Sequence, residues 1–265
     1  MPTIPSGQQP HQLRQVAESF GADPERYDRA RPSYPGAMVA AIAADSPGPD
    51  VLDVGCGTGI SSRQFQAAGC KVLGIDVDAR MADVARRSGV EVEVAAFEAW
   101  EPAGRTFDTV IAGQTWHWVD PVAGAAKAAQ VLRPGGRLSV FWNVAQPPPE
   151  VSATFAEVYA RVLPELPISK ATMTPLEGYA VMFTNAADGM RAEKAFGEPD
   201  QTRYDWERTY TRDEWLDQVP THGGHSRFAP EQQAELLAGI GAAIDAVGGA
   251  FTMEYATVAV TAVRI

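Results

Sequence analysis

The stretch that decides the fold is residues 51–59, VLDVGCGTG, which is followed directly by a helical pattern from Ile60 to Ala68. Four residues typical of a strand run into three glycines at alternate positions. Glycine is needed where the backbone takes a positive φ or approaches a ligand more closely than a Cβ permits. A strand, a glycine loop and a helix in this order predict a nucleotide-sized site at the carboxyl edge of a parallel sheet. We expect the carboxylate of Asp53 to order the amides of the loop.

The spacing of the glycines limits the class of ligand that the loop can bind. A dinucleotide-binding fold places its third glycine three residues after the second, whereas Gly55, Gly57 and Gly59 lie two residues apart. No Lys-Ser or Lys-Thr pair follows, which excludes a P-loop. A second predicted strand, 71–75, ends in Asp76, where a carboxylate can accept hydrogen bonds from both hydroxyls of a ribose. The loop and this acid require a nucleoside but no pyrophosphate, and S-adenosylmethionine fits that description.

Five short segments connect the chain to a known family. They are GCGTG (55–59) with Asp76, LRPGG (132–136), YDRARPSYP (27–35), FEAW (97–100) and WHWV (116–119). The first two resemble motifs of the class I S-adenosylmethionine-dependent methyltransferases, and the other three resemble the small-molecule, methyltransferase type 11-like branch. The resemblance covers nearly the whole chain, but only loosely residues 145–200.

This resemblance implies an α/β fold of the Rossmann-like, doubly wound kind. We expect seven strands, mostly parallel, with an antiparallel last strand between the fifth and sixth, and a helical lid or insertion. The predicted division is one methyltransferase domain, 1–265, with four parts: an N-terminal cap segment (13–45), a cofactor-binding core (50–145), a lid or insertion (146–198) and C-terminal strands and helices that complete the sheet (199–265).

Hydrophobic periodicity and capping signals place the individual elements. Strands are expected at 90–94, 107–113, 137–142, 201–211 and 251–263, and helices at 13–20, 36–44, 79–88, 121–132, 152–163, 212–219 and from Pro230 onward. Residues 164–195 show no strong periodicity, so we assign them to the lid or insertion without placing an individual element there. Four large residues of this stretch either line a substrate pocket or attach the lid to the body: Met173, Tyr179, Met182 and Phe183.

Composition limits the partners. The 265 residues are 45% hydrophobic and 21% charged, with a formal net charge of −11. Phosphate contacts dominate nucleic-acid affinity, and the chain has no basic run longer than Arg86-Arg87, so we expect no nucleic acid and no membrane partner. We expect a small-molecule substrate and leave the oligomeric state open. Two cysteines without a disulfide framework, and no signal peptide, suit a cytoplasmic location.

The resemblance assigns roles to residues around the loop. The expected cofactor-binding residues are Tyr27, Arg31, Gly55, Cys56, Gly57, Gly59, Asp76, Val77, Met81, Phe97, Glu98, Gln114 and Trp116. Many relatives place an aspartate that contacts the adenine after the third strand. Ala96 stands there in this chain, so the amide of Phe97 or the carboxylate of Glu98 is expected to replace it. Met81 lies under the adenine or packs in the core.

Segment 27–35 is expected to fold over the cofactor. An arginine fork suits a carboxylate, so Arg31 is the expected partner of the carboxylate of S-adenosylmethionine, with a surface salt bridge as the alternative. Gln114, after the fourth strand, is expected beside the methionine part of the cofactor. Trp116 is expected to pack on the cofactor or on the sheet edge.

His117 is the one candidate for a catalytic residue. An imidazole titrates near neutral pH and can act as a general base. Relatives that share the following Trp118-Val119 carry glutamine at this position, trans-aconitate methyltransferases among them, and glutamine cannot act as a base. We therefore favour His117 as a pocket-lining or hydrogen-bonding residue. His222 and His225 are expected in a surface loop, with substrate contact as the alternative, and no metal site is expected.

These observations predict an enzyme that transfers a methyl group from S-adenosyl-L-methionine to an oxygen, nitrogen or carbon atom of a small molecule, with S-adenosyl-L-homocysteine as product. Two alternatives remain open. One is a non-catalytic S-adenosylmethionine-binding protein, which would share every cofactor motif. The other is an NAD(P)-dependent oxidoreductase, against which the glycine spacing argues.

Overall fold

One seven-stranded sheet organises the protein, as seen in a computed structural model that describes residues 18–165 and 173–265. The spatial order is β3-β2-β1-β4-β5-β7-β6. The strands are β1 (Asp50–Val54), β2 (Lys71–Asp76), β3 (Glu91–Val94), β4 (Phe107–Gly113), β5 (Leu132–Gln146), β6 (Asp200–Thr211) and β7 (Ala250–Val263). β1 to β5 are parallel, and β7 runs antiparallel between β5 and β6. The predicted seven-stranded topology is confirmed.

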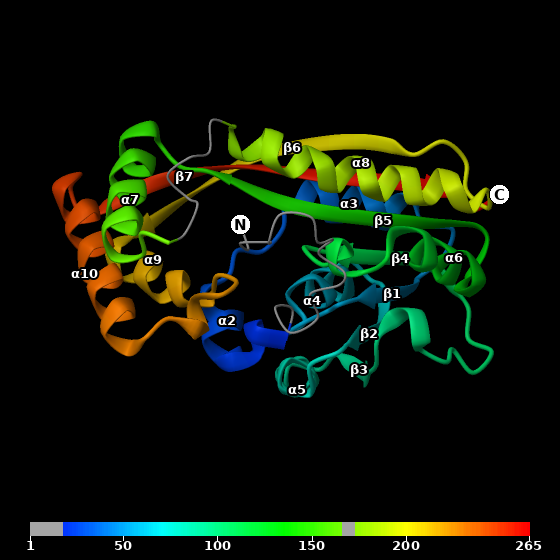
Figure 1. Ribbon diagram of the computed structural model, residues 1–265. Coiled ribbons are helices and arrows are strands. Elements are labelled where there is room, and N and C mark those ends of the chain that lie inside the picture. Colours follow the sequence, from blue (N-terminus) through cyan, green and yellow to red (C-terminus); the bar gives the residue numbers. More distant parts are fainter. Residues whose placement is uncertain (1–17, 166–172) are drawn as a thin grey trace.

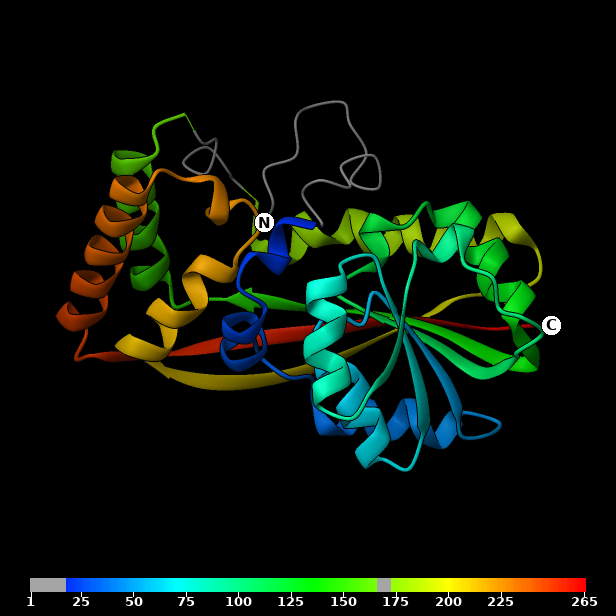
Figure 2. The ribbon, with the colours of Figure 1, turned by 90° about the horizontal axis from the view of Figure 1, so that it is seen from below.

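Helices cover both faces of this sheet, as Figures 1 and 2 show. They are α2 (Pro24–Ala30), α3 (Gly36–Asp45), α4 (Ile60–Ala67), α5 (Ala79–Arg87), α6 (Pro121–Val131), α7 (Pro149–Val162), α8 (Pro175–Glu193), α9 (Arg212–Gln218) and α10 (Pro230–Ala246). On one face α3 and α4 pack Met38 and Phe65 against Phe141 of β5. On the other face α6 and α8 pack against β5 and β7. The central parallel strands are therefore buried on both sides, as parallel strands require.

Helix α8 lies in the stretch that the sequence assigned to a helical lid or insertion without placing an individual element there. It begins with a capping box in which Thr174 and Glu177 bond each other's backbone amides. Four apolar residues along one side are buried: Met182, Phe183, Ala186 and Met190. They belong to the main core, where full burial of each large side chain contributes about 1.5–3 kcal/mol. Met182 and Phe183 thus attach this helix to the sheet.

Other boundaries shift by smaller amounts. β5 extends over 132–146, well beyond the predicted 137–142, and α7 begins three residues before the predicted 152. The predicted helix at 13–20 lies mostly outside the described residues, since the structure describes a short 3₁₀ helix, η2 (Glu18–Ala22), and nothing before it. The division of the chain into cap, core, lid and C-terminal part stays a prediction.

A second hydrophobic cluster lies beyond the end of the parallel strands. The last pairing of β4 with β5 is Gly113 with Phe141, whereas β5 continues to Gln146 and β7 pairs with β6 alone over 250–253. On this extension α7, α9 and α10 bury Phe155, Trp215 and Leu236. We call α7, α9, α10, the 3₁₀ helices η6 (Val219–Thr221) and η7 (His225–Arg227), and the strand ends that they cover, the helical lobe. Figure 1 shows α2 between this lobe and α5.

Candidate functional site

The glycine loop lies where the strand order reverses, between β1 and β4, which is the usual binding edge of such sheets. Gly55, Gly57 and Gly59 all have positive φ, at 65°, 55° and 84°. A Cβ on Gly55 would lie 2.0 Å from the Cγ2 atom of Thr115. The Gly55 amide donates to the carbonyl of Ile75 at 2.7 Å, which fixes the loop against β2. Glycine is therefore required here both by conformation and by space.

Asp76 ends β2 and faces this loop. Its Oδ2 atom accepts from the Gly57 amide at 2.8 Å, and its Oδ1 atom accepts from the Asp78 amide at 2.8 Å. The side chain is buried, and burial raises the pKa of the carboxyl group to about 6 despite these amides. The carboxylate is thus held at the edge of the loop, and each of its oxygens retains a lone pair for a further donor.

Asp53 has a different environment from the expected one. Its Oδ2 atom accepts from the hydroxyls of Ser61 and Ser62 at 2.7 and 2.6 Å, at the start of α4. The expectation that it orders the loop amides is wrong, because those of Gly55 and Cys56 bond a β2 carbonyl instead. The Oδ1 atom is buried without a partner among the described residues. Burial raises the pKa of this carboxyl group to about 6.

The side chains next to the loop differ in whether they pack in the core or also border the loop. The Cys56 thiol is buried against Ala82 and Val92, and burial raises its pKa well above the ordinary value, so only the backbone of this residue faces the loop side. Met81 is buried, but its Cε atom lies 3.5 Å from where a Cβ on Gly57 would stand. Val77 is half-buried directly after Asp76. Met81 thus borders both the core and the loop.

The predicted adenine-side residues follow β3 and β4. Phe97 is buried in the main core at the start of the 3₁₀ helix η3 (Phe97–Ala99). Glu98 is exposed, and its Oε1 atom accepts from the Asp120 amide at 3.1 Å. Trp116, in η4 (Trp116–Trp118), is 2% exposed and packs in the same core, 6.2 Å from the Phe97 ring. The structure brings these residues together, and their contact with a cofactor stays a prediction.

Gln114 has a strained backbone at the end of β4. Its φ of 56° makes it one of three non-glycine residues with positive φ in the described part of the chain. Such conformations cost free energy and cluster at functional sites. Its Nε2 atom donates to the carbonyl of Asn143 at 3.0 Å, and its side chain lies beside Tyr179 of α8. The sequence offered Tyr179 as a residue that lines a pocket or attaches the lid, and the structure brings it to this strand end.

His117 is held as a neutral imidazole. The indole Nε1 of Trp142 donates to its Nδ1 atom at 3.2 Å, and burial lowers its pKa to about 3. With Nδ1 accepting, the ring proton lies on Nε2, so the free edge of the ring is a hydrogen-bond donor. This arrangement favours the pocket-lining, hydrogen-bonding role over general-base catalysis.

Arg31 stands out among the arginines of its segment. Arg26 and Arg29 of α2 both bind Asp217 of α9, at 3.1 and 2.9 Å. Arg31, one residue after α2, lies over the ring of Tyr27 with its Cζ atom 5.1 Å from the ring centre. The structure gives it no carboxylate partner within the described ranges 18–165 and 173–265. A half-buried guanidinium without an anion is a ready binding position for one.

His222 and His225 are not in a surface loop, so that expectation is wrong. His225 is buried and His222 half-buried, inside the helical lobe. The Tyr159 hydroxyl lies 2.8 Å from the Nε2 atom of His225. No local sequence pattern indicates this pairing, because Tyr159 lies 66 positions before His225. Over the described residues no group of three or more metal-binding side chains occurs.

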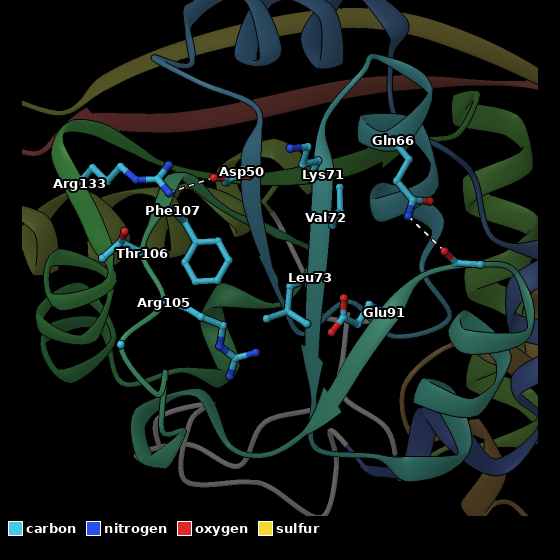
Figure 3. A pocket seen from close by; sticks show the side chains of 12 residues that line it. Asp50, Gln66, Lys71, Val72, Leu73, Glu91, Arg105, Thr106, Phe107 and Arg133 are labelled. Carbon is cyan, nitrogen blue, oxygen red and sulfur yellow. Dashed lines mark hydrogen bonds and ion pairs between the residues drawn. The ribbon is translucent and has the colours of Figure 1, made fainter.

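A surface hollow of about 700 Å³ lies elsewhere, as Figure 3 shows. It is bordered by the first residues of β1 to β4, which are Asp50, Lys71, Glu91 and Phe107. The guanidinium of Arg133 pairs with Asp50 across it at 2.9 Å. The hollow is therefore at the opposite end of the strands from the glycine loop, away from the predicted cofactor site.

No helix in the described part of the chain is long and apolar enough to span a membrane.

Comparisons with known proteins agree with this geometry. A family model described as methyltransferase domain matches residues 51–136. An uncharacterized methyltransferase of Mycobacterium tuberculosis is 36% identical over 132 residues, which are 49% of this chain and 54% of that protein. The chain thus spans about half the length of such curated relatives. A demethylmenaquinone methyltransferase of Corynebacterium kroppenstedtii is 27% identical over 187 residues, 68% of this chain and 79% of that one.

Solved structures share the fold. A protein of Anaeromyxobacter dehalogenans, provisionally described as a type II methyltransferase, matches with a TM-score of 0.61 and 22% identity, over 87% of this chain and 97% of that chain. This likeness concerns the fold, while the family model covers the glycine loop and the strands around it. Over residues 51–136 the chain is therefore similar to a methyltransferase domain.

Proposed function

We propose that the protein transfers a methyl group from S-adenosylmethionine to a small-molecule acceptor. The observation that carries this proposal is the carboxylate of Asp76 at the carboxyl end of β2, bonded to the Gly57 amide. A carboxylate in that position binds the two hydroxyls of a ribose. The three positive-φ glycines beside it form a loop without the spacing that a diphosphate needs.

Two further groups fit the amino-acid end of the cofactor. The Arg31 guanidinium has no carboxylate partner among the described residues and suits the carboxylate of the methionine part. The Oδ1 atom of Asp53 is a buried acceptor without a partner in the described part of the chain, and it suits the ammonium group of the same part. Gln114 lies between them at the end of β4. Met81, Phe97 and Glu98 are the proposed neighbours of the adenine.

Bound S-adenosylmethionine supplies a methyl group on a positively charged sulfur, which is a good leaving group. The remaining task of the chain is to align the acceptor atom with that group and to exclude water. Trp116, Trp118 and His117 follow β4 at this edge, and the segment from Tyr27 to Tyr34 covers it. His117 supports the acceptor as a neutral N–H donor, because its imidazole is not protonated near neutral pH.

Relatives support a small acceptor. The Corynebacterium protein is named for demethylmenaquinone, and a relative from Aromatoleum aromaticum, 39% identical over 99 residues, is named for ubiquinone biosynthesis. Both names describe small molecules rather than nucleic acids.

The test combines binding with turnover. Calorimetry should show that S-adenosylhomocysteine binds and that NAD does not. Incubation with S-adenosylmethionine and a panel of hydroxylated, carboxylated and amine metabolites should then produce S-adenosylhomocysteine with at least one of them. Tight NAD binding would overturn the proposal in favour of an oxidoreductase. Cofactor binding without turnover across the panel would instead favour a non-catalytic binding protein.

A further inference from the structure

The helical lobe contains a polar cluster that the proposed cofactor contacts do not use. It consists of Tyr159, Gln218, His222, His225 and Tyr255, which we call the lobe cluster. These residues come from α7, the continuous stretch from α9 to η7, and β7, so three separate parts of the sequence meet here. Their convergence in a lobe that is otherwise apolar calls for a physical explanation.

Within the cluster most polar atoms have partners, but one buried acceptor does not. The Tyr159 hydroxyl lies 2.8 Å from the Nε2 atom of His225, and the Nε2 atom of Gln218 lies 3.5 Å from the Nε2 atom of His222. Gln218 also lies beside Tyr255, whose hydroxyl is 2.7 Å from that of Tyr210. Gln218 is only 3% exposed, and its Oε1 atom has no partner among the described residues. A buried carbonyl oxygen without a donor is costly, so the site lacks an O–H or N–H group.

The charges around the cluster discriminate between donors. The neighbouring carboxylates on α9 are already engaged, since Asp217 binds Arg26 and Arg29 and Glu214 caps the helix through Thr211. Burial lowers the pKa of both His222 and His225, to about 4 for His225, and the positive charge of Arg31 adds to this for His222, so both rings are neutral. An ammonium group in the cluster would be repelled by the positive charge of Arg31, and Asp217 and Glu214 are already engaged and do not offset this repulsion. A neutral hydroxyl is not repelled and needs no carboxylate partner.

Aromatic rings border the same place. The His222 ring lies 5.9 Å from that of Trp215 and 5.5 Å from that of His225, and the Phe228 ring lies 5.0 Å from His225. The indole N–H of Trp215 is also without a partner in the described part of the chain. Aromatic walls around a few polar groups are typical of sites for flat organic molecules.

Arg31 connects this cluster to the cofactor edge. The helix α2, which ends directly before Arg31, packs against α9 and η6 on the lobe side. On the other side the Tyr27 ring of α2 lies 6.2 Å from that of Phe20, which lies 6.3 Å from Trp118 after β4. Figure 2 shows α2, which ends at Arg31, between the lobe and the helices of the cofactor half. A molecule that reaches from the strand ends past Arg31 therefore meets the lobe cluster.

We propose that the lobe cluster is the subsite for the methyl acceptor and that it takes a neutral hydroxyl on a flat ring, which donates a hydrogen bond to the Oε1 atom of Gln218. This inference rests on the proposed function, because it names the acceptor class of the same reaction. It selects hydroxylated rings over amines, and it makes Gln218 a specificity-determining residue.

The experiment uses phenol as the probe, with toluene and benzylamine as partners of similar shape. Each is titrated into the full-length protein, with and without S-adenosylhomocysteine, while ¹H–¹⁵N spectra follow the indole signal of Trp215, identified by Trp215→Phe, and the imidazole signals. Phenol should shift the Trp215 and His222 signals saturably. Toluene and benzylamine should bind about tenfold more weakly, since each lacks the neutral hydroxyl donor.

Gln218→Leu should weaken phenol binding about tenfold and leave toluene binding unchanged, because it removes the acceptor but not the walls. Gln201→Leu, on the exposed edge strand β6, is the matched control and should change neither. If Gln218→Leu does not fold, as judged by circular dichroism, Gln218→Met replaces it, since it keeps the length of the side chain and also removes the acceptor, with the same expected loss for phenol.

Three outcomes would overturn the subsite: benzylamine or toluene binding as tightly as phenol, phenol binding that Gln218→Leu leaves intact, or no shift of the Trp215 signal by any probe. The proposed function is judged separately, by calorimetry with S-adenosylhomocysteine. Loss of that binding would break the methyltransferase proposal, while the titration without cofactor would still decide whether the cluster binds a hydroxylated ring.

Discussion

The cofactor edge and the helical lobe differ in how their polar groups are assembled. At the cofactor edge, Gly57 and Asp76 meet because β1 and β2 are parallel neighbours whose carboxyl ends lie side by side. In the helical lobe, Tyr159 and His225 meet only because α7 and η7 pack on the same extension of the sheet. The first arrangement follows from strand order, and the second depends on a packed core.

This difference indicates how strongly substitutions should affect the cofactor edge and the helical lobe. The cofactor edge depends on backbone conformation at a few positions, so single substitutions there should have large and local effects. The lobe depends on many contacts, and α2 joins it to the other half through Asp217 on one side and the pair of Asp28 with Arg63 on the other. Substitutions at that junction should have small effects.

The largest effect is expected from Gly55→Ala. The new Cβ would meet Thr115 at 2.0 Å and hold a positive φ, which together should cost at least about 3 kcal/mol of unfolding free energy and abolish S-adenosylhomocysteine binding. Gly69→Ala is the control, because Gly69 also has positive φ but nothing within 4 Å, so it should cost only about 1 kcal/mol. Urea unfolding measures both, and equal losses would show that space at Gly55 is unimportant.

Asp76→Ala should weaken S-adenosylhomocysteine binding more than about tenfold, from the ~1.5–3 kcal/mol of a hydrogen bond to a charged group. Calorimetry gives the dissociation constant. Asp83→Ala removes an exposed carboxylate of α5 that pairs only with Arg86, and it should leave the affinity unchanged. An affinity unaffected by Asp76→Ala would remove this residue from the ribose.

Proton release should accompany cofactor binding near pH 6. Burial raises the pKa of Asp76 from 3.8 to about 6 in the free protein, so part of the population is protonated there. Ribose hydroxyls donate to the ionised form and should lower this pKa. The raised pKa also means that, between pH 3.8 and about 6, the folded state binds more protons than the unfolded one. The contribution of this group to stability is therefore present at low pH and lost as pH rises through 6.

Calorimetry at pH 6 in two buffers of different ionisation enthalpy measures the release. Asp76→Asn should abolish the proton release that comes from Asp76. Asp53→Asn should keep that release, although burial also raises the pKa of Asp53 to about 6. Identical enthalpies in both buffers for the unaltered protein would show that neither carboxyl changes its protonation.

His117→Gln should keep substantial activity, far from the roughly 10²-fold or greater loss that follows removal of a general base. Glutamine can accept from the Trp142 indole as His117 does, and the pH profile above pH 6 should not change, because the His117 pKa is about 3. Near-complete loss at neutral pH would restore His117 as the base. His117→Phe serves as the comparison, since it leaves the Trp142 N–H unpaired and should lower stability by about 1–3 kcal/mol.

The smallest effect is expected at the junction. Asp217→Asn weakens the pairs with Arg26 and Arg29, and partly exposed ion pairs contribute only about 0.2–1 kcal/mol each. Cofactor affinity should fall by less than about tenfold on the same estimate. Asp188→Asn, whose partner Arg191 lies on α8, is the control. Complete loss of cofactor binding in Asp217→Asn alone would show that this junction positions α2 cooperatively.

Much of the fold was predictable because its signals are local. The positions of β1, β2 and β4 follow from short apolar runs, and the capping box of Thr211 and Glu214 fixed the start of α9 correctly. Helix α8 escaped prediction because its buried stripe, Met182 to Met190, gains meaning only from the sheet that it covers. Propensity is weak where packing decides.

The candidate site divides in the same way. The sequence by itself determined the glycine loop and Asp76, because a strand, a turn that needs positive φ and a second strand are encoded within 51–76. Only the tertiary structure decided that the Arg31 guanidinium has no carboxylate partner in the described part, and that Gln218 lies buried beside His222. Burial and pairing depend on side chains far apart in the sequence, and no local pattern records which of them will meet.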